Sequence, residues 1–217
     1  MKKITQYIGE RLQLNKERIT NKYQYFPERI KELKDIIENI TNEHINDKII
    51  DLNMIDTSKI TNMDVLFYRN SYNYDISQWN VSNVTSMSSM FEGSNFNGDI
   101  SQWDVSQVKN MAYMFCDSAF NSDISQWDVS NVETMYGMFL NSFFNKDISQ
   151  WDVSRVKNMN HMFKFSKFNQ DISDWDVSSV THMLEIFYKS QFNQDLTSWK
   201  DKIKDKTLLK YIEDYIK

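Results

Sequence analysis

The chain has 217 residues, of which 41% are hydrophobic and 25% are charged, and its formal net charge is −5. This composition is ordinary for a soluble globular protein of one or two domains, and the acidic balance argues against a nucleic-acid binder, which normally carries a basic stripe. The single cysteine, Cys116, excludes an internal disulfide, and no apolar run is long enough to span a membrane.

Residues 1–50 are predicted to form a helical N-terminal cap. An apolar face recurs at helical spacing over residues 30–40, and Pro27 suits a first helical position. A shorter helix is expected over residues 4–12. Residues 1–20 are either part of the cap or a leader that targets the chain to another assembly, and we leave both alternatives open.

The N-terminus also bears on localisation. No apolar signal-peptide core follows Lys2 and Lys3. We therefore expect the chain as written to be cytoplasmic. The alternative is the cell surface or a virion, reached by a route that the sequence does not show.

Residues 51–199 repeat with a constant period of 24 residues. All six tryptophans keep this step, as do columns of aspartate, phenylalanine and asparagine. There are six units over residues 51–194, the first of them degenerate, and a truncated seventh at 195–199. A unit this short buries its apolar side only against its neighbours, which predicts a solenoid.

Each unit combines two apolar patterns. In the second unit, Ile76, Trp79 and Val81 predict a short strand, whereas Val84, Met87, Met90 and Phe91 predict a helical turn or two. The expected fold class is thus a repeat solenoid of leucine-rich-repeat type, with parallel short strands and short helical turns. We expect the tryptophans in its core, with each indole N–H bonded to a neighbouring coil, and the repeated asparagines as a ladder between coils.

Residues 200–217 are predicted to form a C-terminal capping helix. Its apolar positions are Leu208, Leu209, Ile212, Tyr215 and Ile216. A solenoid exposes its core at both ends, so a cap is required there.

The repeated motif W-D-V-S-x-V-x-x-M-x-x-M-F…F-N-x-D-I-S resembles that of BspA-like leucine-rich-repeat surface proteins. It is carried here by Trp103–Ser106, Met111, Met114–Phe115 and Phe120–Asn121. The resemblance implies a parallel repeat scaffold, surface display in many members and protein contact or adhesion in some, and it implies no catalytic residues. The position of the usual leucine-rich-repeat asparagine holds valine here, as at Val84, so strong curvature is not expected.

Several groups of residues resemble metal or catalytic sites but have a simpler structural explanation. The Met-x-x-Met pairs sit where a core packs, and His161 and His182 lack a third ligand of the right type, so we expect neither a metal nor another cofactor. The aspartates that begin each unit fit turn chemistry, with a bound cation or a basic partner as the alternatives. No convergent acid–base group can be named, so we expect no enzyme and no small-molecule substrate.

Two surfaces are candidates for contact with an unidentified protein partner. One is an acidic strip along the predicted strands, and the other is a group of large residues where the repeat departs from its consensus in the central units. The expected partner-binding residues are Asp104, Asp128, Asp152, Asp176, Gln126, Tyr136, Leu140, Phe143 and Phe165.

The sequence therefore predicts a non-catalytic protein-binding or adhesion scaffold of bacterial or phage type. The alternative is a phage- or virion-associated structural component that is directed to its assembly by residues 1–20.

Overall fold

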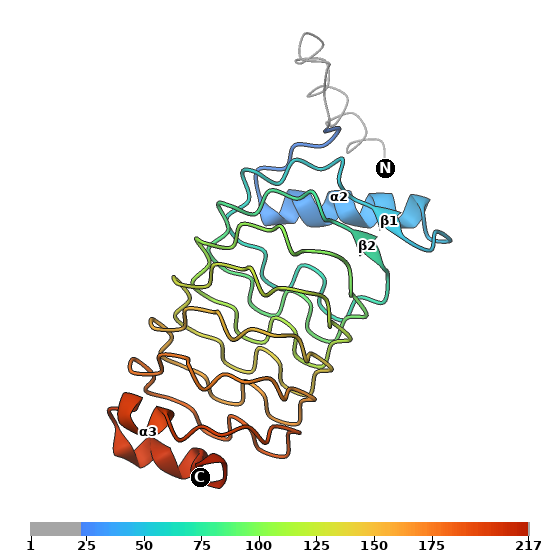
Figure 1. Ribbon diagram of the computed structural model, residues 1–217. Helices are drawn as coiled ribbons and strands as arrows, with labels where there is room; N and C mark the ends of the chain where they lie inside the picture. The colour runs from blue at the N-terminus through green and yellow to red at the C-terminus, as the bar shows by residue number, and fades with distance from the viewer. Residues whose placement is uncertain (1–22, 217) are drawn as a thin grey trace.

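The computed structural model describes residues 23–216, and these residues wind in a stack of similar coils (Figure 1). The helix expected over residues 4–12 and the candidate leader at 1–20 lie outside the described part of the chain. Helix α2 lies across one end of the stack, and helix α3 lies at the other end, beside the C-terminus.

Helix α2 spans Ile30–Glu43 and covers the first coil. Leu33, Ile37 and Ile40 are buried along one face of the helix, as their spacing predicts. The helix begins three residues after Pro27, with Arg29 as its N-cap residue, so Pro27 is not at the first helical position.

Successive coils pair in parallel with a step of 24 residues. Strand β1, Ile50–Asp51, pairs with strand β2, Tyr74–Asp75, in the register Ile50 to Tyr74. Beyond these strands, single parallel bridges join residues 62, 86, 110, 134, 158 and 182 in turn. Equivalent residues of neighbouring units therefore lie directly above one another.

The local structure inside each coil differs from the prediction. Ile76–Val81 forms no strand, because the amides of Trp79 and Val84 donate to the carbonyls three residues earlier, at Ile76 and Val81, and close turns. The residues from Val84 to Phe91 form no helix either. A spacing of three residues between apolar side chains fits consecutive turns as well as it fits a helix.

The segment after each bridge is a row of overlapping turns hydrogen-bonded to the next coil. In the second coil the amides of Met87, Ser89 and Phe91 donate to carbonyls 23 residues later in the chain, at 2.8–3.0 Å. Of the amides between them, that of Met90 donates to the carbonyl three residues earlier, and that of Ser88 donates to the Asp64 carboxylate of the preceding coil. The backbone amides of this segment therefore find hydrogen-bond partners either within their own turn or in a neighbouring coil.

Aromatic columns form the core of the stack. Phe115 lies 5.6 Å from Phe91 and 5.8 Å from Phe139 between ring centroids, with the rings nearly parallel. Trp127 is 3% exposed, and its indole N–H donates to the Ile100 carbonyl. The predictions that the tryptophans are buried and that their N–H groups bond to a neighbouring coil are confirmed.

The predicted asparagine ladder is also confirmed. The Oδ1 atom of Asn97 accepts the backbone N–H of Asn121 at 2.8 Å, and that of Asn121 accepts the N–H of Asn145 at 2.9 Å. The same bond recurs through Asn169 to Asn193. Each asparagine thus joins its own coil to the next.

The C-terminal region covers the last coil with three short helices. These are α3 at Trp199–Lys202 and the 3₁₀ helices η2 at Lys206–Tyr211 and η3 at Glu213–Tyr215, in place of one continuous helix. The Tyr215 ring packs edge-on against Phe187 and Phe192, so the aromatic column ends under a side chain of the cap. Within residues 23–216, no helix has the length and apolar character needed to cross a membrane.

Candidate functional site

Non-repeating side chains gather along one side of the stack. In each row of turns the buried Met and Phe residues alternate with four outward positions, which in the second coil are Ser88, Ser89, Glu92 and Gly93. Because the coils are in register, the equivalent positions form one continuous surface, which we call the variable face. Its members in the other coils are Asp64, Val65, Tyr68, Arg69, Ala112, Tyr113, Cys116, Asp117, Tyr136, Gly137, Leu140, Asn141, Asn160, His161, Lys164, Phe165, Leu184, Glu185, Tyr188 and Lys189.

The backbone of the variable face is left-handed at two positions in every coil. These residues lie four positions apart and have φ between 50° and 67°. Only Gly93 and Gly137 are glycines, whereas Val65, Tyr113 and Phe165 are large or β-branched. A left-handed conformation costs an L-residue roughly 1–2 kcal/mol, so bulky side chains are retained here against a backbone preference.

Aromatic rings from three successive coils lie edge to face on the variable face. The ring of Tyr136 lies 4.8 Å from that of Tyr113, at 65°, and 5.5 Å from that of His161, at 89°. Burial raises the pKa of the Tyr113 phenol, and its contact with Tyr136 adds to this shift. Tyr136, one of the predicted residues, is therefore the centre of an aromatic row.

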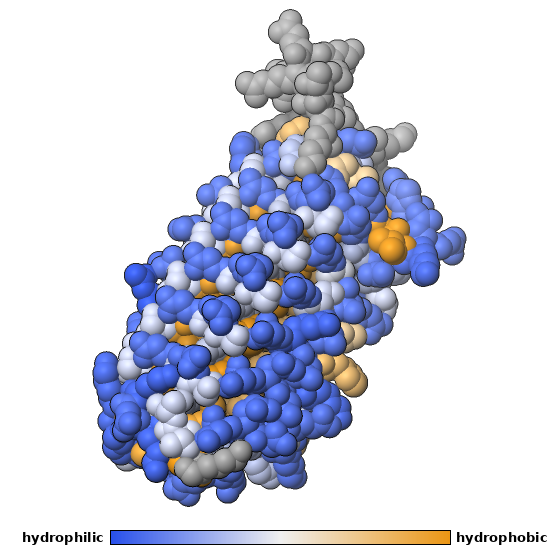
Figure 2. Space-filling model, viewed as in Figure 1, coloured by the Kyte–Doolittle hydropathy of each residue, from blue (hydrophilic) through white to orange (hydrophobic). Residues whose placement is uncertain are grey.

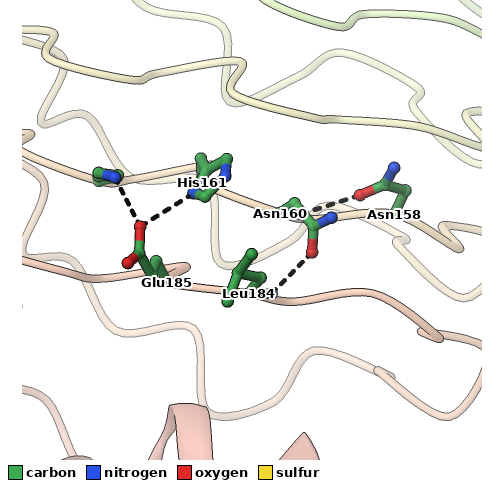
Figure 3. Close-up of polar contacts among 6 residues, drawn as sticks. Asn158, Asn160, His161, Leu184 and Glu185 are labelled. Atoms are coloured by element: carbon green, nitrogen blue, oxygen red, sulfur yellow. Dashed lines mark hydrogen bonds and ion pairs between the residues drawn. The ribbon is translucent and has the colours of Figure 1, made fainter.

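An ionic group continues this row toward the C-terminus (Figure 3). The Glu185 Oε2 atom lies 2.5 Å from Lys164 Nζ and 3.5 Å from His161 Nδ1. Burial lowers the pKa of His161, and the Lys164 charge lowers it further, while Glu185 acts in the opposite direction. The His161 ring is thus held toward its neutral form, and its Nδ1 atom makes no hydrogen bond within the described residues.

Two lysines and two aromatic rings form a compact group that we call the lysine–aromatic cluster: Lys164, Phe165, Tyr188 and Lys189. The Phe165 and Tyr188 rings are 5.8 Å apart, and both side chains are almost half exposed, at 43% and 45%. Lys164 Nζ lies 5.2 Å from the Phe165 ring centre and 5.3 Å from that of Tyr188. Lys189 Nζ lies 6.0 and 5.2 Å from the same two centres.

The predicted large residues of the central units are only partly brought together. Phe165 belongs to the lysine–aromatic cluster, and Leu140 is half-buried on the variable face. Phe143 is 62% exposed but flanks this face, beyond the buried Ser142, and its ring stacks on no other ring of residues 23–216. Choosing candidate residues by their size missed Lys164 and Lys189, although a position-by-position comparison of the units would have identified both.

The acidic strip has a structural role in each coil. Asp104 and its equivalents each accept the backbone N–H of the serine two residues later, at 3.0–3.1 Å. The Gln126 amide donates to the neighbouring Ser125 hydroxyl. The repetition of these residues is therefore accounted for by local turns. The residues in question are Asp104, Asp128, Asp152, Asp176 and Gln126.

The aspartates that begin each unit serve the same purpose, as predicted. The Asp123 carboxylate accepts the Ser125 N–H at 2.8 Å, and the hydrogen bonds from Ser125 hold the pKa of this carboxyl below its usual range. No group of three or more His, Cys, Asp or Glu residues suited to a metal ion occurs in the described part of the chain. The face of the molecule seen in Figure 2 is mainly hydrophilic, with hydrophobic residues visible between rows of polar ones.

Cys116 occupies a position of the variable face but does not contribute to its exposed surface. Its side chain is buried, and burial raises the pKa of the thiol well above its usual range, with a further contribution from Asp117. A protonated, buried thiol is a poor nucleophile. Cys116 is thus a packing residue in this structure.

Comparison with known proteins identifies one related family. The sequence model described as "Mycoplasma protein of unknown function, DUF285" matches residues 31–143 and 117–211, which together include the helical region, the repeats and most of the C-terminal cap. No curated protein and no solved structure gives a significant match to the chain.

Proposed function

The chain belongs to the DUF285 family of Mycoplasma proteins of unknown function, and we propose that it is a non-catalytic repeat scaffold that binds a protein partner through its variable face. The observation that carries the proposal is the presence of bulky, non-repeating side chains at left-handed backbone positions. Strained residues that persist in a structure are found preferentially where the side chain serves a function.

The strain argument compares these positions with the rest of the coil. Glycine and asparagine adopt the left-handed conformation readily, and the chain places them there at Gly93, Gly137 and Asn141. If stacking of coils were the only requirement, these residue types would be expected in every coil. Val65, Tyr113 and Phe165 stand in their place, which favours a role for their side chains in contacts outside the chain.

The chemistry of the variable face also favours a protein partner. Exposed rings with nearby charged groups, as at Phe165 and Tyr188, are typical of the anchors of protein–protein interfaces. The acidic strip is the second candidate surface. Its aspartates are already used in turns, so we assign binding to the variable face.

We further propose that the chain is a member of the BspA-like leucine-rich-repeat group and that its coils are a solenoid of that general type with helical caps. The 24-residue step, the parallel pairing and the tryptophan and asparagine columns support this proposal. The turns in place of strands and helices would make it an unusual variant.

Site-specific photocrosslinking tests the proposed binding function. The photoreactive amino acid benzoylphenylalanine replaces either Phe165 on the variable face or Gln126 on the acidic strip, and the full chain is exposed to an extract of its source cells. We expect a discrete adduct from position 165 that competing unmodified protein suppresses, and none from position 126. An adduct only from position 126 would assign binding to the acidic strip, and its absence from both positions would contradict the proposal.

A further inference from the structure

We infer that the lysine–aromatic cluster binds an acidic protein segment that carries a large apolar side chain. This inference rests on the proposed function and adds the chemistry of the partner. It concerns only Lys164, Phe165, Tyr188 and Lys189, in the last two full coils of the stack.

The geometry of the cluster provides both an apolar surface and positive charge. The Phe165 and Tyr188 rings meet edge to face, at 70°, and leave nearly half of each side chain exposed. Both lysine ammonium groups lie within 6.0 Å of both ring centres. An apolar side chain placed against these rings would therefore bring its flanking carboxylates close to the two lysines.

The local charge is opposite to that of the whole protein. The chain carries a net charge of −5, whereas the cluster contains two lysines and contacts one acidic residue, Glu185. Glu185 pairs with Lys164, and Lys189 makes no ion pair among residues 23–216. Lys167, an exposed residue two positions after Phe165, adds further positive charge to this region. Such a patch attracts an acidic partner by charge complementarity.

The Lys189 position is also well suited to a charge reversal. Lys189 has φ 53°, and Glu185, which has φ 52°, shows that glutamate occupies a left-handed position of the same coil. Lys189→Glu should therefore change the charge of the cluster and leave the backbone as it is. A matched control is Lys109→Glu, which makes the same charge change at an exposed position two coils or more away.

A nucleic acid is the competing ligand for a group of lysines and rings. Phosphate-backbone binding draws on many cationic contacts along a strand. Here one of the two cluster lysines is already paired with a carboxylate, and the protein as a whole is acidic. The observations therefore favour the acidic peptide, and single-stranded DNA enters the experiment as a competing probe.

The experiment measures fluorescence anisotropy of labelled probes titrated with the full chain. The first probe is a short peptide of glutamate and glycine around one central phenylalanine. Matched peptides replace the glutamates with glutamine, replace the glutamates with lysine, or replace the phenylalanine with serine. A single-stranded oligothymidine of similar length is the fifth probe.

We expect the acidic phenylalanine peptide to bind at least about tenfold more tightly than each matched peptide and than the oligothymidine. Lys189→Glu should weaken the binding of this peptide by about tenfold or more and tighten the binding of the lysine peptide. Lys109→Glu should change neither affinity by more than about twofold. Phe165→Ser should weaken the binding of every peptide that contains phenylalanine.

Each contrary result overturns the inference. These results are the absence of binding below about 1 mM peptide, equal binding of the acidic, glutamine and lysine peptides, tighter binding of the oligothymidine, or an affinity that Lys189→Glu leaves unchanged. If photocrosslinking at position 165 captures a partner but Lys189→Glu does not reduce that capture, the variable face is a binding surface and the acidic-partner inference alone fails.

Discussion

The indole N–H of Trp127 donates a hydrogen bond to the backbone carbonyl of Ile100, 27 residues earlier, at 3.0 Å. The same bond joins every tryptophan to the carbonyl 27 residues before it, from Trp79 with Leu52 to Trp199 with Ile172. Each tryptophan thus both fills its own coil and satisfies a polar group of the preceding one.

Trp127→Ala should lower the free energy of unfolding by about 3–5 kcal/mol, because it removes a buried ring. It also removes one of the two hydrogen bonds that the Ile100 carbonyl accepts, the other coming from the Trp103 N–H. Trp127→Phe keeps most of the packing, so its free energy of unfolding should lie between those of the wild type and Trp127→Ala. The measurement is urea unfolding followed by circular dichroism, with Gln126→Ala as the exposed control. A loss below about 1 kcal/mol for Trp127→Ala would contradict the burial of the indole.

Gly137→Ala should destabilise the protein more than Gly93→Ala. Both glycines have positive φ, so each substitution incurs about 1 kcal/mol of backbone strain. A Cβ atom at position 137 would lie 2.7 Å from the Tyr113 ring, whereas one at position 93 would meet the flexible Arg69 side chain at 3.0 Å. We expect the free energy of unfolding, measured by thermal or urea unfolding, to fall by about 2 kcal/mol for Gly137→Ala and by about 1 kcal/mol for Gly93→Ala. Equal losses would show that the Tyr113 ring yields freely.

The turn aspartates predict a loss of stability in acid. Hydrogen bonds from the Ser130 side chain and backbone lower the pKa of Asp128 in the folded state, and those from the Ser178 backbone and side chain lower that of Asp176. The folded pKa lies below the unfolded one, so this stabilisation is complete above the unfolded pKa and is lost as the pH falls through the folded pKa. Urea midpoints measured from about pH 5 down to about pH 2 should therefore decrease.

Asp128→Asn provides the control for this pH dependence. Asparagine at the equivalent position of the second unit, Asn80, accepts the Ser82 N–H at 3.1 Å, so the turn survives without a charge. The variant should fold normally at neutral pH and show a smaller decrease of the urea midpoint in acid. An unchanged slope would mean that Asp128 has the same pKa in both states.

Cys116 should be unreactive in the native protein. Its side chain is buried and its pKa is raised, so Ellman's reagent should modify it only when the chain unfolds. Ala119→Cys, at an exposed position in the same coil, supplies a reactive thiol for comparison. Rapid modification of Cys116 in the folded protein would show that the coil opens locally at this point.

Much of the coil geometry could be predicted from the repeat, but its backbone could not. The buried positions of Ile124, Trp127 and Val129 and the asparagine ladder followed from spacing. The predicted strand and helical turn were wrong, because apolar residues three apart fit both helices and successive turns. The left-handed positions were visible in sequence only where Gly93, Gly137 or Asn141 occupies them, and large residues in the other coils conceal the pattern.

The sequence by itself determined the 24-residue step, the columns of core residues and the places where the repeat is broken, since each coil must bury the same side chains against identical neighbours. Only the tertiary structure decided which of the non-repeating residues meet. Lys164 and Tyr188 are one repeat apart, and register between coils brings the ammonium group to 5.3 Å from the ring centre. Phe143 and Phe165 both stand out in sequence as large residues at otherwise small or polar positions. Only Phe165 packs with a ring of the next coil, because it lies on the variable face in register with that coil, whereas Phe143 flanks the face.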